Sequence, residues 1–267
     1  MKQIYLDNNA TTPVDERVLD VMLPYLKGMY GNPSSVHFSG REAKAAMENA
    51  REQVAKFINA DPSEIYFTSG GTESDNIAIK GTALQKKDKK NHIIVSSIEH
   101  HAILESAHYL EKDGFKVDYL GVDKDGFISP DELKEKITDK TSVVSIMQAN
   151  NEVGTIQDIP SLSAIAKEAG AIFHTDAVQA AGKEVIDVDQ LGADMLSISG
   201  HKVYGPKGIG IIYIRKGKRI TPLFHGGHHE KKRRAGTENI PGIVGIGAAL
   251  ELAESLRETE HKRLAEL

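Results

Sequence analysis

The sequence predicts an α/β protein with a mostly parallel central sheet flanked by helices. Short apolar runs rich in β-branched residues alternate with longer segments that carry one polar face. The chain has 267 residues, 40% of them hydrophobic, which is enough for one large domain or two smaller ones. In sheets of this kind ligands bind beyond the carboxyl ends of the strands. The residues that follow each strand are therefore the candidate site residues.

The expected strands and helices follow one another in regular alternation. The predicted strands are Ile65–Thr68, Ile93–Ser96, Lys116–Leu120, Val143–Met147, Ile172–Thr175, Met195–Ser199 and Ile209–Ile214. The helices predicted between them are Thr72–Gln85, His100–Asp113, Pro130–Ile137 and Pro160–Ala169. Strands that alternate with helices in this way indicate βαβ units.

The two ends of the chain depart from this alternation. Residues 1–15 are predicted to form an N-terminal arm, and a helix is expected from about Gly40 to Phe57. Residues 16–250 are predicted to be one large domain. The stretch Ile243–Leu267 has the pattern of a long amphipathic helix, and its part 251–267 is expected to connect to a further C-terminal domain. A terminal helix docked on its own domain is the alternative.

Composition excludes several classes of site. The net charge of −5 argues against a nucleic-acid-binding protein, which usually carries a basic patch. No stretch approaches the length of a membrane span, so no membrane partner is expected. The absence of cysteine excludes disulfides, cysteine metal ligands and an internal thiol nucleophile. A cytoplasmic location is the default expectation.

The strand that ends at Thr68 is followed by Ser69-Gly70-Gly71-Thr72-Glu73-Ser74. Two glycines and a hydroxyl residue at the start of a helix can present backbone N–H groups to a phosphate. An ordinary N-cap at Thr72, with Asp75 three residues on, explains the segment about as well.

Histidine and asparagine follow the next strands. Glu99-His100-His101 places a histidine at the start of a helix, where it could stack on a ring, bind a metal or cap the helix. Asn150-Asn151 is either turn chemistry or a pair of amides at the mouth of the sheet. His225, His228, His229 and Glu230 share one loop, but their spacing matches no strong zinc signature, so no metal site is expected.

Two charged residues of opposite sign complete the set. Asp176 follows a strand that is expected to be buried, so it needs a cation or a proton, and a structural ion pair is the simplest alternative. Lys202 lies in the turn Gly200–Gly205, where desolvation would favour a nucleophilic neutral amine; a surface lysine is the alternative. A phosphate cradle, an acid for a ring nitrogen and an amine for an aldehyde together describe a pyridoxal phosphate site.

The same segments resemble the cysteine desulfurases, which are class-V aminotransferase-like, fold-type-I pyridoxal phosphate enzymes. The matching segments are Tyr5–Pro13, Gly31–Ser35, Thr68–Asn76, Glu99–His100, Asn150–Gly154, His174–Gln179, Ser199–Gly208 and Arg234–Thr237. They occur in the family's order along nearly the whole chain. The resemblance implies the large cofactor-binding domain of a fold-type-I transferase, with the small C-terminal domain absent.

The resemblance also implies a role for each matched residue. Lys202 would form the Schiff base with pyridoxal 5'-phosphate, and His100 would stack on the ring and assist proton transfer. Asp176 would keep the pyridine nitrogen protonated. The remaining expected contacts are Gln179 with the ring hydroxyl, Asn151 with the substrate end, and Gly71, Thr72, Ser199 and His201 with the phosphate. Thr237 would reach the phosphate of a neighbouring subunit, which implies a homodimer.

The family reaction removes sulfur from L-cysteine, releases alanine and passes the sulfur as a persulfide to iron–sulfur cluster or thio-cofactor assembly. An iron–sulfur scaffold or another sulfur acceptor is therefore an expected partner. The family's persulfide cysteine is absent from this chain, so full turnover by these residues alone is not expected. A selenocysteine lyase, another class-V enzyme and a non-catalytic dimeric scaffold are the alternatives.

Overall fold

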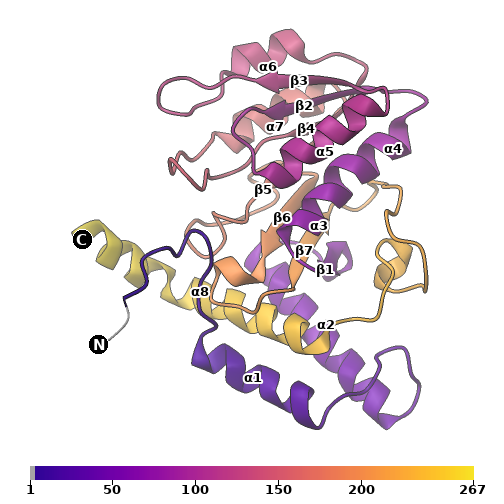
Figure 1. The fold of residues 1–267 in the computed structure, drawn as a ribbon, viewed down its shortest axis with the longest axis vertical. Helices are drawn as coiled ribbons and strands as arrows, with labels where there is room; N and C mark the ends of the chain where they lie inside the picture. The colour runs from indigo at the N-terminus through magenta and orange to yellow at the C-terminus, as the bar shows by residue number, and fades with distance from the viewer. Residues whose placement is uncertain (1–3) are drawn as a thin grey trace.

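The computed structural model describes residues 4–267 and has one seven-stranded sheet at its centre (Figure 1). The strands are β1 (Ile65–Thr68), β2 (His92–Ser96), β3 (Lys116–Leu120), β4 (Thr141–Ser145), β5 (Ile172–Asp176), β6 (Met195–Ser199) and β7 (Gly210–Ile214). Their order in the sheet is β1-β7-β6-β5-β4-β2-β3. Of these strands β7 alone runs antiparallel to its neighbours, β1 and β6. The prediction of an α/β fold with a mostly parallel sheet is confirmed.

Helices cover both faces of this sheet. They are α1 (Glu16–Lys27), α2 (Phe38–Phe57), α3 (Gly71–Asn76), α4 (Thr82–Lys86), α5 (His101–Lys112), α6 (Pro130–Lys136), α7 (Ile159–Glu168) and α8 (Ile240–Glu266). A π-helical turn, Ile77–Gly81, joins α3 to α4, and single 3₁₀ turns span Pro62–Glu64, Gly200–Lys202 and Glu230–Lys232. None of the described helices is long and apolar enough to cross a membrane.

Two apolar clusters form because successive strand residues point to opposite faces of the sheet. On β7, for example, Ile211 and Tyr213 belong to one cluster, and Ile212 and Ile214 belong to the other. The first cluster packs the sheet against α1, α2, α6, α7 and α8, and the second packs it against the π-helical turn Ile77–Gly81, α4 and α5. All strand residues except the first four of β3 are buried, which is why most strands appear in the sequence as short apolar runs.

The structure corrects several predicted boundaries. Strand β4 covers Thr141–Ser145 instead of Val143–Met147, because Thr141 and Ser142 are polar but fully buried in the ladder. The helix expected from about Gly40 begins at Phe38, and the last helix begins at Ile240. Helix α1 was not predicted; it contains Pro24, a residue that usually marks a helix end.

Candidate active site

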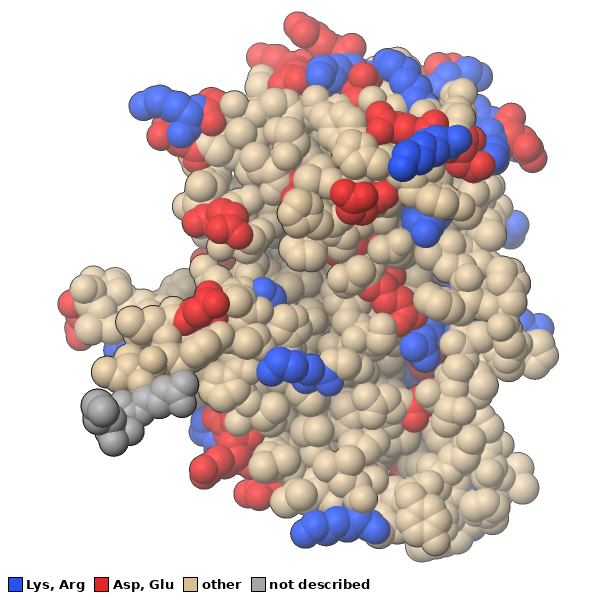
Figure 2. Space-filling model, in the orientation of Figure 1, with Lys and Arg blue, Asp and Glu red and all other residues tan. Residues whose placement is uncertain are grey.

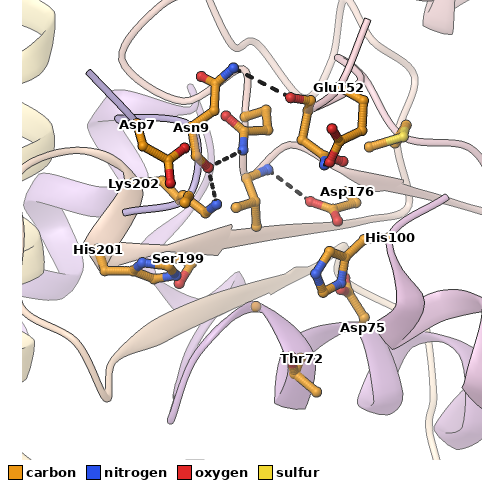
Figure 3. A pocket seen from close by; sticks show the side chains of 16 residues that line it. Asp7, Asn9, Thr72, Asp75, His100, Glu152, Asp176, Ser199, His201 and Lys202 are labelled. Atoms are coloured by element: carbon orange, nitrogen blue, oxygen red, sulfur yellow. Dashed lines mark hydrogen bonds between the residues drawn. The ribbon is translucent and has the colours of Figure 1, made fainter. Parts of the chain in front are cut away.

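The carboxyl ends of the parallel strands surround a cavity of about 550 Å³ (Figure 3). All the predicted site residues except Thr237 line this cavity: Gly71, Thr72, His100, Asn151, Asp176, Gln179, Ser199, His201 and Lys202. They come from α3, the start of α5, the loop after β4, the end of β5 and its following turn, and the end of β6 with its 3₁₀ turn. The topology thus brings together residues far apart in the sequence.

The glycine-rich segment forms the floor of the cavity. Gly70 precedes α3 with φ of +153°, which glycine adopts more readily than other residues. No side chain caps this helix, so the alternative of a Thr72 N-cap is wrong, and the first N–H groups of α3 have no helical partner. A Cβ atom on Gly71 would come within 3.0 Å of Val178 Cγ2. The segment is therefore a close-fitting cradle with free N–H donors.

Asp176 is the last residue of β5 and is 5% exposed. Its Oδ1 accepts a hydrogen bond from the Val178 N–H at 2.8 Å. Burial raises the pKa of Asp176 to about 6, against the opposing effects of this hydrogen bond and of the Lys202 charge. Among the described residues no cationic side chain forms an ion pair with it, so the alternative of a structural ion pair is wrong. The Asp176 carboxyl therefore lies in the cavity wall without a paired cation to offset the cost of burying its charge.

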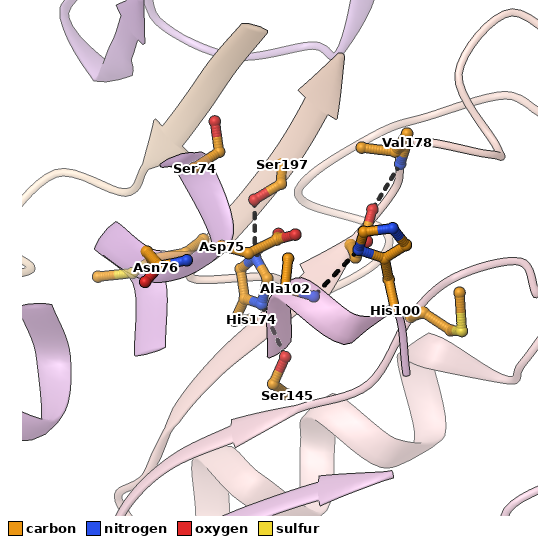
Figure 4. A network of polar contacts seen from close by, with 12 residues as sticks. Ser74, Asp75, Asn76, His100, Ala102, Ser145, His174, Val178 and Ser197 are labelled. Atoms are coloured by element: carbon orange, nitrogen blue, oxygen red, sulfur yellow. Dashed lines mark hydrogen bonds and ion pairs between the residues drawn. The ribbon is translucent and has the colours of Figure 1, made fainter. Parts of the chain in front are cut away.

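A second buried carboxyl, Asp75, is close enough to Asp176 for their charges to interact, and Figure 4 shows it next to His174. Its burial, together with the charge of Asp176, holds the pKa of Asp75 well above its usual value. The nearby His174 is neutral, because burial lowers its pKa to about 3, and its two ring nitrogens lie 2.8 and 3.0 Å from the hydroxyls of Ser145 and Ser197. Burial and the neighbouring Asp176 charge therefore both favour the protonated form of Asp75.

Lys202 ends the 3₁₀ turn after β6 and is half-buried in the cavity wall, rather than on the open surface. Its Nζ donates a hydrogen bond to the backbone carbonyl of Asn9. Burial lowers the pKa of the ammonium, while Asp176, Asp7 and Glu152 raise it. The lysine is thus partly desolvated next to the buried Asp176.

His100 is the N-cap of α5, as one of the sequence alternatives expected, and it also lines the cavity. Its Nδ1 accepts a hydrogen bond from the Ala102 N–H at 3.1 Å. Burial, then the charges of Lys202 and His101, lower the pKa of His100. The ring is therefore neutral at pH 7 with its proton on Nε2.

Thr237 lies apart, in a smaller hollow that it shares with Glu230, Arg234 and other residues. The histidine loop is engaged elsewhere: His229 Nδ1 accepts the Gly236 N–H at 3.2 Å, and Glu230 pairs with Arg51 at 2.8 Å. Within residues 4–267 no group of three or more His, Asp or Glu side chains is arranged to hold a metal ion.

Sequence reasoning assigned no role to several residues of the cavity wall: Asp7, Asn9, Ala10, Asp75, Met147, Glu152 and Val178. The N-terminal arm reaches the site because the Thr12 N–H and hydroxyl both donate to the His201 carbonyl, at 2.9 and 3.0 Å. A contact between residues so far apart in the sequence cannot be predicted from a local pattern. Asp75 could have been singled out, because an aspartate on the buried side of a helix is unusual unless it has a partner or a function.

A family model described as Aminotransferase class-V matches residues 4–266. The protein named cysteine desulfurase IscS of Dictyoglomus turgidum is 55% identical over 266 residues, which are 100% of this chain and 68% of that protein. The protein of the same name of Methanosarcina thermophila is 56% identical, over 100% of this chain and 66% of that protein. The chain spans about two thirds of the length of these relatives.

Solved structures give the same picture. A structure titled NIFS-like protein superposes with a TM-score of 0.96 at 47% identity, and covers 98% of this chain and 72% of its own. A structure titled SspA in complex with cysteine superposes with a TM-score of 0.91 at 43% identity, over 99% of this chain and 78% of its own.

Proposed function

This chain belongs to the class-V aminotransferase family, and we propose that it is the cofactor-binding portion of a cysteine desulfurase. The resemblance stated from the sequence motifs is confirmed by the family match and by relatives named cysteine desulfurase. The proposed reaction takes sulfur from L-cysteine, releases alanine and supplies a persulfide for iron–sulfur cluster or thio-cofactor assembly. A cytoplasmic location and a scaffold or other acceptor protein as partner remain predictions.

The observation that carries this proposal is the placement of Lys202 and Asp176 in one cavity above a glycine cradle. Pyridoxal phosphate fits the donor set: the buried Asp176 lacks a cation, and a protonated ring nitrogen would provide one. The free N–H groups at Gly71 and Thr72, with Ser199 and His201, would hold the phosphate. Lys202 would bind the aldehyde, Gln179 the ring hydroxyl, and His100 would lie against the ring.

When bound, pyridoxal phosphate supplies an electron-accepting ring that stabilises negative charge at the α-carbon of an amino acid. The chain supplies the proton chemistry. Lys202 Nζ, with its pKa lowered by burial, is the group that takes the α-proton. His100 presents an N–H at Nε2 and is neutral, so it serves as a hydrogen-bond donor and ring contact instead of the first base. Asn151 lies at the cavity wall where it can orient the substrate.

The chain contains no cysteine, so the thiol that receives the sulfur must come from outside these 267 residues. This separates two halves of the reaction experimentally. The purified chain with pyridoxal phosphate should exchange the α-proton of L-alanine for deuterium in D₂O, followed by NMR. Lys202→Arg, which keeps the charge but not the reactivity, should abolish the exchange.

The second half should fail without an acceptor. We expect little or no alanine from L-cysteine unless an external thiol is added, and the loaded protein should otherwise stop before sulfur transfer. Absence of α-proton exchange in a folded, cofactor-loaded protein would favour the non-catalytic scaffold instead. Rapid alanine release without any added thiol would contradict the assignment of the sulfur acceptor.

We also propose that the chain acts as a homodimer. Thr237 lies outside the cavity of its own subunit, and the segment between α1 and α2 exposes Tyr30 and Val36, at 87% and 89%. Exposed large apolar side chains of this kind favour a protein interface. On the face shown in Figure 2, acidic and basic side chains are interspersed and form no single-sign patch. A monodisperse monomer in sedimentation at micromolar concentration would contradict this proposal.

A further inference from the structure

Gln179 lies in the cavity wall with both ends of its side-chain amide engaged. It is 8% exposed. Its Oε1 accepts a hydrogen bond from Lys183 Nζ at 2.9 Å, and its Nε2 donates to the Asn9 carbonyl at 2.9 Å. Figure 3 shows that the same Asn9 carbonyl also receives the Lys202 ammonium. Two lysines therefore approach Gln179 and its partner from different sides.

The turn after β5 explains why Lys183 reaches Gln179. The N–H groups of Lys183 and Glu184 both donate to the Ala180 carbonyl, at 2.9 and 2.8 Å, and those of Ala180 and Ala181 donate to Ala177. These bonds form two consecutive tight turns, and Gly182 adopts a φ of +75° in the second of them. The chain therefore doubles back on itself, which places Lys183 within hydrogen-bond distance of the Gln179 side chain.

The chemistry of lysine fixes the orientation of the amide. The two ends of a glutamine amide are nearly identical in shape, so shape alone does not decide which end faces a cavity. An ammonium donates hydrogen bonds and accepts none, and a backbone carbonyl accepts and donates none. The oxygen must therefore face Lys183, and the nitrogen must face Asn9.

Of the two partners only Asn9 lines the cavity, whereas Lys183 is not among the lining residues. The oxygen of Gln179 is thus bonded to a residue outside the cavity lining, and its NH₂ group is bonded to a residue of the lining, with one N–H left after the bond to Asn9. The cavity accordingly presents a donor at this point, which suits an anionic ring oxygen.

Within residues 4–267, Lys183 forms no ion pair that would offset the cost of burying its ammonium. Burial lowers the pKa of Lys183, the nearby charge of Lys202 lowers it further, and no carboxylate of the described residues offsets these effects. A partly buried ammonium close to another lysine is energetically unfavourable. Its hydrogen bond to the Gln179 oxygen is the favourable contact that the structure shows for it.

We infer that Lys183 is a positioning residue that fixes the Gln179 amide so that its N–H faces the ring oxygen of the bound cofactor. The inference rests on the proposed pyridoxal phosphate site and deepens it. Lys183 does not touch the cofactor in this account. It acts through Gln179, and its removal should affect ligands that carry the ring oxygen more than ligands that lack it.

The first test needs no cofactor. In ¹⁵N-labelled, cofactor-free protein the side-chain NH₂ signals of Gln179, assigned with Gln179→Glu, should form one sharp pair. Lys183→Met should broaden or double this pair, and Lys183→Arg, which restores a donor, should return it to a single state. Unchanged signals in Lys183→Met would overturn the inference, whatever the cofactor does.

The second test compares two ligands in equilibrium titrations. The wild-type chain should prefer pyridoxal phosphate over 3-deoxypyridoxal phosphate, which lacks the ring oxygen. Lys183→Met should reduce this preference by roughly 3- to 10-fold, the effect of one hydrogen bond, while Lys183→Arg should keep most of it. The exposed Lys124→Met serves as the matched control and should leave the preference unchanged.

The outcomes separate the inference from the proposed function. Equal weakening of both ligands in Lys183→Met would show a merely structural role and overturn the inference. If the folded wild-type chain binds neither ligand, the proposed function fails, and the NMR result alone then decides whether Lys183 orients Gln179.

Discussion

Replacement of Glu230 by alanine should destabilise the protein, because it removes one partner of a buried ion pair. Glu230 is 7% exposed and Arg51 is 3% exposed. Two guanidinium nitrogens of Arg51 donate to the two carboxylate oxygens, at 2.9 and 2.8 Å, and the Phe67 N–H donates to Oε2 at 2.9 Å. The pair joins the loop that carries Thr237 to α2 and β1.

The magnitude follows from what Arg51 would keep. Removing one partner of a buried pair costs about 3–5 kcal/mol, because the other charge stays buried without compensation. Arg51 would retain the Ile65 carbonyl at 2.8 Å and the more exposed Glu48 at 3.2 Å. We therefore expect a loss at the lower end of this range, about 3 kcal/mol. Glu48→Ala, the matched control, should cost less than about 1 kcal/mol.

Urea denaturation of the cofactor-free protein, followed by far-UV circular dichroism, measures both values. The double variant Arg51→Met with Glu230→Leu tests the reasoning further, because apolar replacement of a whole buried pair is often neutral or stabilising. It should recover most of the stability that Glu230→Ala loses. A loss below about 1 kcal/mol for Glu230→Ala would refute the view that this pair holds the loop in place.

Three further predictions concern Asp176 and two residues near the cavity, Glu99 and Gly210. Burial raises the pKa of Glu99 to about 8, above its value in the unfolded chain. The contribution of this group to the free energy of unfolding is therefore fully present at pH 4 and is lost as the pH rises through 8. Glu99→Gln should flatten this decline in urea titrations, and an unchanged decline would contradict the prediction. Asp176→Asn removes a buried carboxylate, so it should stabilise the cofactor-free protein at pH 8 by on the order of 1–2 kcal/mol. The same variant should bind the cofactor more weakly in titrations. A loss of stability in the cofactor-free protein would contradict the view that Asp176 lacks an ion-pair partner. Gly210→Ala would place a Cβ 2.6 Å from the Gly70 backbone. It should therefore lower the free energy of unfolding by about 1–3 kcal/mol and weaken cofactor binding. Wild-type cofactor affinity in this variant would refute the close fit of the Gly70–Gly71 segment.

The parts of the fold that the sequence predicted best are those dictated by local pattern. Strands β1, β3 and β6 have the predicted bounds. Strands β1 and β6 are short apolar runs flanked by polar or glycine residues, whereas β3 ends before Gly121. Helix α1 escaped prediction because Pro24 lies inside it and few of its side chains, such as Val18 and Met22, are buried. The π-helical turn between α3 and α4 depends on packing under the sheet and leaves no mark in the residue pattern.

The site was predictable where it follows strand ends and unpredictable where it depends on distant contacts. Lys202 and Asp176 are placed together by the parallel pairing of β5 and β6, because both residues lie at or just beyond the carboxyl ends of these strands. The contribution of Asn9 depends on an arm that crosses the sheet edge through backbone bonds to residues 201–204. The orientation of Gln179 likewise depends on two partners, Lys183 nearby and Asn9 in the N-terminal arm.

The most direct test of the central claim is whether Lys202 bonds covalently to pyridoxal phosphate. The purified chain is mixed with the cofactor, its absorbance is recorded, and the complex is reduced with borohydride and mapped by peptide mass spectrometry beside Lys202→Ala. We expect a visible absorption band and a single modified peptide that contains Lys202, both absent from the variant. A folded wild-type chain without the band, or with modification at other lysines only, would contradict the assignment of this cavity as a pyridoxal phosphate site.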